Sequence, residues 1–153
     1  MTTRSGNVAE STDESLIADL SELIATHKVV QRDLCLIVLV VDDLDAIRGL
    51  YGSTTAGEVL GGLGRRIDAL TRGTDLVTRA DDNEYAVVLT TISDPEDAQL
   101  VAEKLRRQIG EPMSAGGHEI HVTAHIGISV AREGDSGTDL LERARRRARS
   151  QRA

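Results

Sequence analysis

The sequence predicts an α/β (α+β) fold in which helices pack on a mixed, ferredoxin-like sheet. The run LCLIVLVV at 34–41 is apolar throughout, which is typical of a central strand buried on both faces. A strand–turn–strand pattern at 76–90 predicts an antiparallel hairpin, and segments with helical spacing precede, separate and follow these strands. The length of 153 residues suits one domain with one hydrophobic core.

The N-terminal third predicts a tail, a helix and the central strand. Residues 1–12 are mostly small and polar, so we expect a disordered tail there. Apolar residues then recur at helical spacing, which predicts an amphipathic helix near 13–27. The strand at 34–41 ends at Asp42-Asp43, where acidic side chains can cap a short helix.

The middle third predicts a glycine-containing helix followed by the hairpin. Thr55 and Glu58 have the capping-box spacing, and the helix they open runs to about Leu70. Four glycines inside this helix weaken it, by about 1 kcal/mol each relative to Ala, and indicate close packing against a neighbouring element. Hairpin strands at 76–79 and 84–90 flank Asp and Asn residues, which tolerate the positive φ of a two-residue turn.

The C-terminal third predicts a helix, a strand and a last helix. A capping-box pattern opens the helix at 93–109, and alternating apolar residues predict strand structure over 119–130. Ser136 and Asp139 have the spacing of a further helix start, so we expect the chain to close on a helix.

Composition and charge exclude several classes of function. The chain has no Trp and no Phe for stacking bases, and its formal net charge of −7 disfavours binding to nucleic acid. Its longest apolar run is too short to span a bilayer, and the single cysteine, Cys35, cannot form an internal disulfide; we therefore expect a cytoplasmic protein without membrane insertion. The arginines between Arg143 and Arg152 fit either a solvated helix end or a local basic patch.

Four sequence words together resemble the GGDEF family, the diguanylate cyclases. LIVLVVDDLDAIRGLYG (36–52) is similar to the family's first strand and helix, and AGEVL (56–60) to its GDEVL helix start. DLVTRADDNEYAVVL (75–89) lies in the place of its signature hairpin, and VTAHIGIS (122–129) is similar to its VTASIGIA strand. The order and spacing of the four words also match the family. The resemblance implies a single domain at 13–150 with a five-stranded sheet wrapped by helices. It also implies an activity that joins two GTP molecules, held on facing subunits, with the help of two metal ions.

The signature of that family, D-x-x-x-R-x-G-G-D-E-F, is degenerate in this chain. The resemblance places a metal-binding Asp at Val40 and a second metal-binding acid at Asn83, but Val cannot bind Mg²⁺ and neutral Asn is a poor substitute for a carboxylate. The two signature glycines fall on acids whose carboxylates would repel a triphosphate. We interpret the surviving Glu and aromatic residue as scaffold. The degenerate signature is Asp81, Asp82, Asn83, Glu84 and Tyr85.

The family's nucleotide-binding positions have changed as well. Its phosphate-binding Lys falls on Asp45, its guanine-reading Asn falls on Arg48, and its guanine-reading Asp falls on Gly57. The sequence therefore predicts no catalytic residue and no cofactor, and the chain is expected not to be an enzyme.

One functional word survives, because R-G-T-D at 72–75 lies where many family members carry an R-x-x-D site for cyclic di-GMP. Arg72 would then contact a phosphate or a guanine edge, and Asp75 would accept from guanine N–H groups. Arg106 or Arg107 on the next helix would complete such a site. The competing interpretation is structural, since Arg and Gly commonly end a helix and Asp before a strand commonly fixes a turn.

Three hypotheses about function remain open. The first is a cyclic di-GMP receptor that acts through Arg72 and Asp75 and signals by dimer or partner contacts. The second is a protein-interaction scaffold whose helix at 13–27 mediates dimerisation or docking to a protein partner. The third is an enzyme with a relocated carboxylate cluster, for which Asp42 and Asp43 are the candidate metal ligands; the alternative is that these acids are caps facing water.

Overall fold

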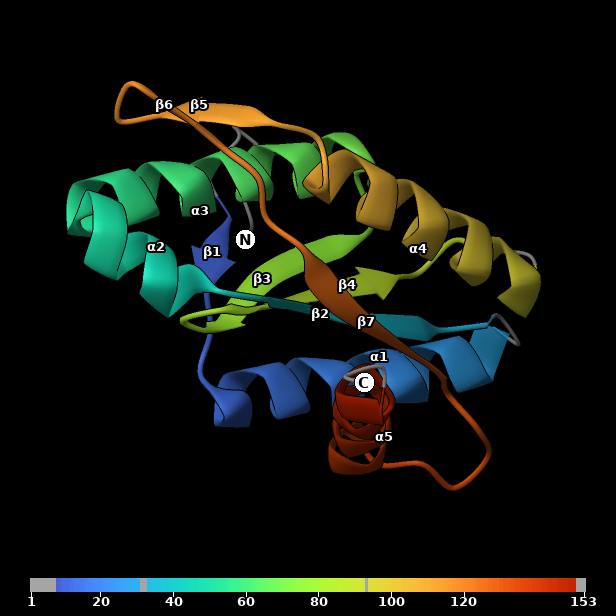
Figure 1. Cartoon of the computed structure of the whole chain (residues 1–153). Helices are drawn as coiled ribbons and strands as arrows, with labels where there is room; N and C mark the ends of the chain where they lie inside the picture. The colour runs from blue at the N-terminus through green and yellow to red at the C-terminus, as the bar shows by residue number, and fades with distance from the viewer. Residues whose placement is uncertain (1–7, 31–32, 93, 151–153) are drawn as a thin grey trace.

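The computed structural model describes residues 8–30, 33–92 and 94–150, and these form five helices, a mixed five-stranded sheet and a small two-stranded sheet (Figure 1). The helices are α1 (Asp13–Val30), α2 (Leu44–Tyr51), α3 (Ser53–Ala69), α4 (Pro95–Ile109) and α5 (Gly137–Ser150). The strands are β1 (Ala9–Glu10), β2 (Cys35–Val41), β3 (Leu76–Asp81), β4 (Glu84–Leu89), β5 (Met113–Ala115), β6 (His118–Ile120) and β7 (Ala124–Val130). The predicted fold class and five-stranded sheet are confirmed.

Strand β2 lies inside the main sheet, whose order is β1-β3-β4-β2-β7. It pairs antiparallel with β4 on one side and with β7 on the other. Figure 1 shows α3 and α4 over one face of the sheet and α1 and α5 over the opposite face. Alternate side chains of β2 enter two cores, because Ile37 packs with α3 and α4 whereas Val38 packs with α1 and α5. This double burial explains why the strand is apolar at every position.

The N-terminal segment differs from the disordered tail predicted over 1–12. Residues 1–7 lie outside the described part of the chain, but Ala9–Glu10 form β1, which pairs parallel with β3. The pairing continues into Ser11, whose backbone N–H donates to the carbonyl of Arg79 at 3.0 Å. Pairing along a sheet edge uses main-chain groups and requires no apolar side chain, so composition did not reveal it.

Two predicted element boundaries are wrong. Helix α3 begins at Ser53, so Thr55 lies within the helix and is not its cap. Glu58 instead accepts a hydrogen bond from the backbone N–H of Gly116, 2.7 Å away, and holds the β5–β6 hairpin on α3. The strand predicted over 119–130 divides into β6 and β7 because the chain passes there from the small sheet to the main sheet.

The turn between β3 and β4 does not use the predicted positive φ. Among the described residues, Asp43 is the one non-glycine with a positive φ. The ladder shifts register between Arg79 and Asp81, so a bulge provides the local change of direction.

Helix α5 packs directly on β7 and carries arginines toward the end of β2. A Cβ atom at Gly127 would lie 2.0 Å from the carbonyl oxygen of Ala144, so only glycine permits this approach. The predicted capping residues start the helix: Ser136 Oγ accepts from the N–H of Asp139 at 3.1 Å, and the Asp139 carboxylate accepts from the N–H of Ser136 at 3.0 Å. No helix in the described ranges is both long and apolar enough to cross a membrane.

Candidate functional site

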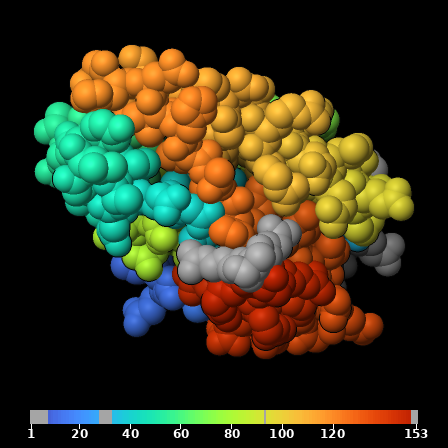
Figure 2. Space-filling model, viewed as in Figure 1, coloured from blue at the N-terminus to red at the C-terminus, as the bar shows by residue number. Residues whose placement is uncertain are grey.

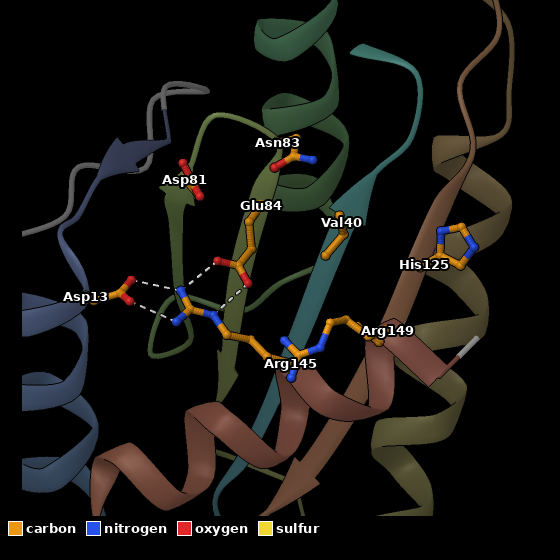
Figure 3. Close-up of a pocket in the computed structure, with 9 residues that line it drawn as sticks. Asp13, Val40, Asp81, Asn83, Glu84, His125, Arg145 and Arg149 are labelled. Atoms are coloured by element: carbon orange, nitrogen blue, oxygen red, sulfur yellow. Dashed lines mark hydrogen bonds and ion pairs between the residues drawn. The ribbon is translucent and has the colours of Figure 1, made fainter. Parts of the chain in front are cut away.

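The end of β2 and the β3–β4 hairpin bring the two expected metal-binding positions together. Val40 lies opposite Glu84 on β4 and opposite His125 on β7. Val40, Asn83 and Glu84 line one cavity of about 330 Å³ (Figure 3). Where the resemblance implies two carboxylates facing metal ions, this cavity presents an isopropyl group and a neutral amide.

The carboxylate of Glu84 is held by the guanidinium of Arg145 on α5. Arg145 Nε and Nη2 donate to the two carboxylate oxygens of Glu84 at 2.9 and 2.7 Å. Arg145 Nη1 and Nη2 also donate to the carboxylate of Asp13 on α1, at 2.9 and 2.8 Å. Such bidentate, charge-assisted pairs belong to the strongest class of protein hydrogen bonds. The Arg145 guanidinium therefore joins the β3–β4 hairpin to α1 and to its own helix, α5, as Figure 3 shows.

This network changes the protonation equilibria of its members. Hydrogen bonding to Arg145 lowers the pKa of Asp13. The pKa of Arg145 is raised above its ordinary range by its hydrogen bonds, chiefly the one to Asp13 and next the one to Glu84. Glu84 is only 7 % exposed. A buried carboxylate needs a counter-charge, and here an internal arginine supplies it.

Sequence reasoning did not identify Arg145, which it treated as one of several C-terminal arginines. Helical spacing contains a signal, because Arg145 follows the buried Leu141 by four residues and so lies beside the inward face of α5. Two further arginines of this helix also bind within the protein: Arg143 pairs with Asp135 at 2.6 Å, and Arg147 donates to a backbone carbonyl of β7. Within the described part of α5, Arg143, Arg145 and Arg147 therefore bind groups of the protein itself, which a fully solvated helix end would not do.

Acidic side chains surround a second cavity, of about 720 Å³, between the start of α2 and the hairpin turn. Asp42 is bound by Thr123 Oγ1 at 3.0 Å and by His125 Nδ1 at 2.8 Å. Asp43, expected to cap the short helix, makes no side-chain cap hydrogen bond. Within the described ranges, no group of three or more His, Cys, Asp or Glu side chains is placed to hold a metal ion. The acids that line this cavity are Asp42, Asp43, Asp45, Asp81 and Asp82.

The R-G-T-D word forms a tight turn between α3 and β3. Asp75 is 5 % exposed, and its carboxylate accepts from the backbone N–H of Arg72 at 2.9 Å and from that of Thr90 at 3.0 Å. The carboxylate therefore holds the turn, as the structural interpretation of this word expected. The Arg72 side chain is exposed at the surface of the same turn.

Arg72 and Asp75 line a cavity of about 280 Å³ together with residues of α4. The basic residue that α4 contributes to this lining is Lys104. The predicted partners Arg106 and Arg107 are not among the lining residues, and Arg106 pairs instead with Glu103 at 2.6 Å. Arg106 and Arg107 thus lie outside this lining, because the sequence does not fix the rotation of α4 about its axis.

Comparison with known proteins identifies similar sequences and similar folds. The family model described as diguanylate cyclase, GGDEF domain, matches residues 14–153. The bifunctional diguanylate cyclase/cyclic di-GMP phosphodiesterase MucR of Pseudomonas aeruginosa is 30% identical over 99 residues, which cover 65% of this chain and 14% of MucR. The chain thus spans a small part of that relative's length.

Solved structures match the whole architecture. The GGDEF domain of TpbB (YfiN) from Pseudomonas aeruginosa superposes with a TM-score of 0.86 at 22% identity, covering 97% of this chain and 91% of that one. The GGDEF domain of DgcB from Caulobacter crescentus, solved in complex with c-di-GMP, superposes with a TM-score of 0.83 at 16% identity, covering 94% and 85% of the two chains. At these identities the superpositions establish the fold.

Proposed function

Because this chain belongs to the GGDEF family, we propose that it is a non-catalytic member that serves as a cyclic di-GMP receptor. The observation that carries the first half of this proposal is the Arg145–Glu84–Asp13 network at the hairpin. The second half rests on three observations: Arg72 and Lys104 line one cavity, the name of one relative includes cyclic di-GMP, and a domain of the same fold was solved with c-di-GMP.

The hairpin site opposes two-metal chemistry for three reasons. Val40 offers no ligand atom, and Asn83 offers a neutral amide where Mg²⁺ prefers carboxylate oxygens. Glu84 already has both carboxylate oxygens on Arg145, so a metal ion would have to displace a bidentate ion pair. The carboxylates of the neighbouring cavity would repel the triphosphate of GTP, since like charges about 4 Å apart cost about 4 kcal/mol at an effective dielectric constant near 20.

The cavity at the Arg72 turn has the chemistry of a site for a phosphate-containing ligand. Arg72 and Lys104 bring two cations from different elements to one cavity. Leu100 lies beside them on α4 with 61 % of its surface exposed, which provides an apolar surface for a nucleobase. In this proposal Asp75 positions the backbone of Arg72, and Arg72 and Lys104 contact the ligand.

Isothermal titration calorimetry with cyclic di-GMP tests the receptor proposal. We expect binding by the wild-type chain and at least a tenfold loss of affinity in Arg72→Ala and in Lys104→Ala. Arg107→Ala is the matched control, because it removes an exposed cation from the same helix but outside the cavity lining. Absence of heat at tens of micromolar ligand, or equal loss in the control, would reject the proposal.

The non-catalytic half of the proposal has a separate test. The chain is incubated with GTP and either Mg²⁺ or Mn²⁺, and the products are separated by chromatography. We expect no cyclic dinucleotide. Its formation at a rate above that of a heat-denatured control would show that the Arg145 network does not exclude turnover.

A second candidate function, a protein-interaction scaffold, is favoured by one surface feature. Leu50 is 76 % exposed and Tyr51 is 39 % exposed at the end of α2. The centroid of the Tyr51 ring lies 4.6 Å from that of the His118 ring on β6, and Figure 2 shows α2 (teal) beside the β5–β6 hairpin (orange) at the surface. Helix α1, expected to mediate dimerisation, buries Leu16 and Leu20 in the protein's own core and so cannot offer that face. Sedimentation velocity of wild type and Leu50→Asp, with and without cyclic di-GMP, separates this role from the receptor role.

A further inference from the structure

His27, near the C-terminal end of α1, is held between two hydrogen-bond acceptors. Its Nδ1 lies 2.9 Å from the carbonyl oxygen of Leu23, and its Nε2 lies 3.1 Å from the carbonyl oxygen of Thr90 at the end of β4. The residue is 9 % exposed, so water cannot freely replace either partner. A neutral imidazole has one N–H donor, whereas the protonated ring has two. Only the protonated ring can donate to both carbonyls.

Thr90 connects this histidine to the Arg72 turn. The backbone N–H of Thr90 donates to Asp75 at 3.0 Å, and its Oγ1 donates to the carbonyl of Thr74, also at 3.0 Å. The other oxygen of the Asp75 carboxylate accepts from the N–H of Arg72. Thr90 and Asp75 are 8 % and 5 % exposed, and buried hydrogen bonds of this kind are costly to leave unmade.

A continuous chain of hydrogen bonds therefore runs from α1 through Thr90 and Asp75 to the backbone of Arg72. The groups that face the two ring nitrogens are uncharged carbonyls, one from α1 itself and one from the end of β4. The next charged group in this series of hydrogen bonds is the Asp75 carboxylate, and the Arg72 guanidinium at the cavity follows it. These contacts provide a route from the protonation state of His27 to the geometry of the cavity.

We propose that His27 is a positioning residue that orients the Arg72 turn and makes anion binding at that cavity depend on pH. The proposal rests on the proposed function, because cyclic di-GMP is the expected ligand of the cavity. At low pH the doubly protonated ring donates to Leu23 and Thr90 and fixes the turn. The neutral ring has one donor; when its proton is on Nδ1, the ring donates to Leu23, the Thr90 carbonyl loses its imidazole partner, and the turn loosens.

Two readouts on the full chain test this inference at pH 6 and pH 8, a range over which an ordinary histidine titrates. The first is calorimetric affinity for cyclic di-GMP. The second is the hydrogen-exchange protection factor of the Arg72 and Thr90 amides, which needs no ligand. We expect both to fall about fivefold in wild type as the pH rises, which corresponds to the net effect of one hydrogen bond. His27→Gln, which retains an amide donor but does not titrate, should show no such fall.

His121→Gln is the matched control, since His121 is exposed on the loop after β6 and should leave both pH profiles as in wild type. Equal pH dependence in His27→Gln and wild type would overturn the inference. If that variant does not fold, wild-type protection factors that are the same at both pH values would also overturn it. Failure of cyclic di-GMP to bind at either pH would reject the proposed function, while the exchange data would still decide the role of His27.

Discussion

Replacement of Arg145 by methionine is expected to destabilise the fold by about 3 kcal/mol. Methionine retains much of the aliphatic stem but removes every hydrogen bond to Glu84 and Asp13. Removing one partner of a buried ion pair costs about 3–5 kcal/mol because the other charge stays buried without compensation. We take the lower value because the side chains of Arg145 and Asp13 are 22% and 54% exposed, which weakens part of the network.

A second substitution separates the effect of charge from that of packing. In Arg145→Met/Glu84→Gln the buried carboxylate becomes a neutral amide of nearly the same volume. We expect the double variant to recover about 2 of the 3 kcal/mol, because replacing a buried pair by neutral groups is often close to neutral. Asp13→Asn should cost less than about 1 kcal/mol, since more than half of that side chain is exposed.

Urea unfolding at pH 7, followed by circular dichroism, measures these free energies. Arg146→Met is the control, because Arg146 is the next residue on the same helix and is exposed. A cost below about 1 kcal/mol for Arg145→Met, or no recovery in the double variant, would refute the reasoning. A similar cost in the control would assign the effect to the helix and not to the ion pair.

Two further predictions concern packing and pH. Gly127→Ala should lower the free energy of unfolding in urea by at least about 2 kcal/mol, because its Cβ would lie 2.0 Å from the backbone of α5. Gly57→Ala should raise it by about 0.5–1 kcal/mol, because a Cβ there would meet nothing within 4 Å and alanine favours the helix α3. Hydrogen bonding to Arg143 lowers the pKa of Asp135, so its contribution is present above the ordinary value of 3.8 and is lost as the pH falls through the folded-state pKa. Asp135→Asn should therefore lower the free energy of unfolding at pH 7 and weaken its decrease below about pH 4. The measurement is the free energy of unfolding as a function of pH, with Asp45→Asn as the surface control. An unchanged decrease below about pH 4 in Asp135→Asn would contradict this prediction.

The features that could be predicted from the sequence are those that burial imposes on local pattern. A strand covered on both faces must be apolar at every position, which identified β2 and its neighbours. The reciprocal spacing of Ser136 and Asp139 identified the start of α5 because cap hydrogen bonds are local. The order of these elements then fixed the fold class.

The features that could not be predicted depend on contacts between distant segments. Strand β1 forms by main-chain pairing, which leaves no compositional trace. Lys104, in place of the expected arginines, lines the Arg72 cavity because of how α4 rotates on the sheet. His27 is separated by 63 residues from the Thr90 carbonyl that gives it a second acceptor, so no local pattern contains that contact.

The substitution at Val40 and the pairing of Arg145 with Glu84 are two parts of one electrostatic arrangement. Val40 lies directly opposite Glu84 in the β2–β4 ladder, so a carboxylate at position 40 would add a second negative charge beside a buried one. A single guanidinium that already binds two carboxylates cannot compensate a third, and a divalent cation could. An apolar residue at position 40 therefore allows α5 to close on the hairpin through Arg145, and the same pairing occupies the Glu84 carboxylate that could otherwise bind a metal ion. The proposed lack of catalysis and the attachment of α1 and α5 to the hairpin would follow from the same charge balance.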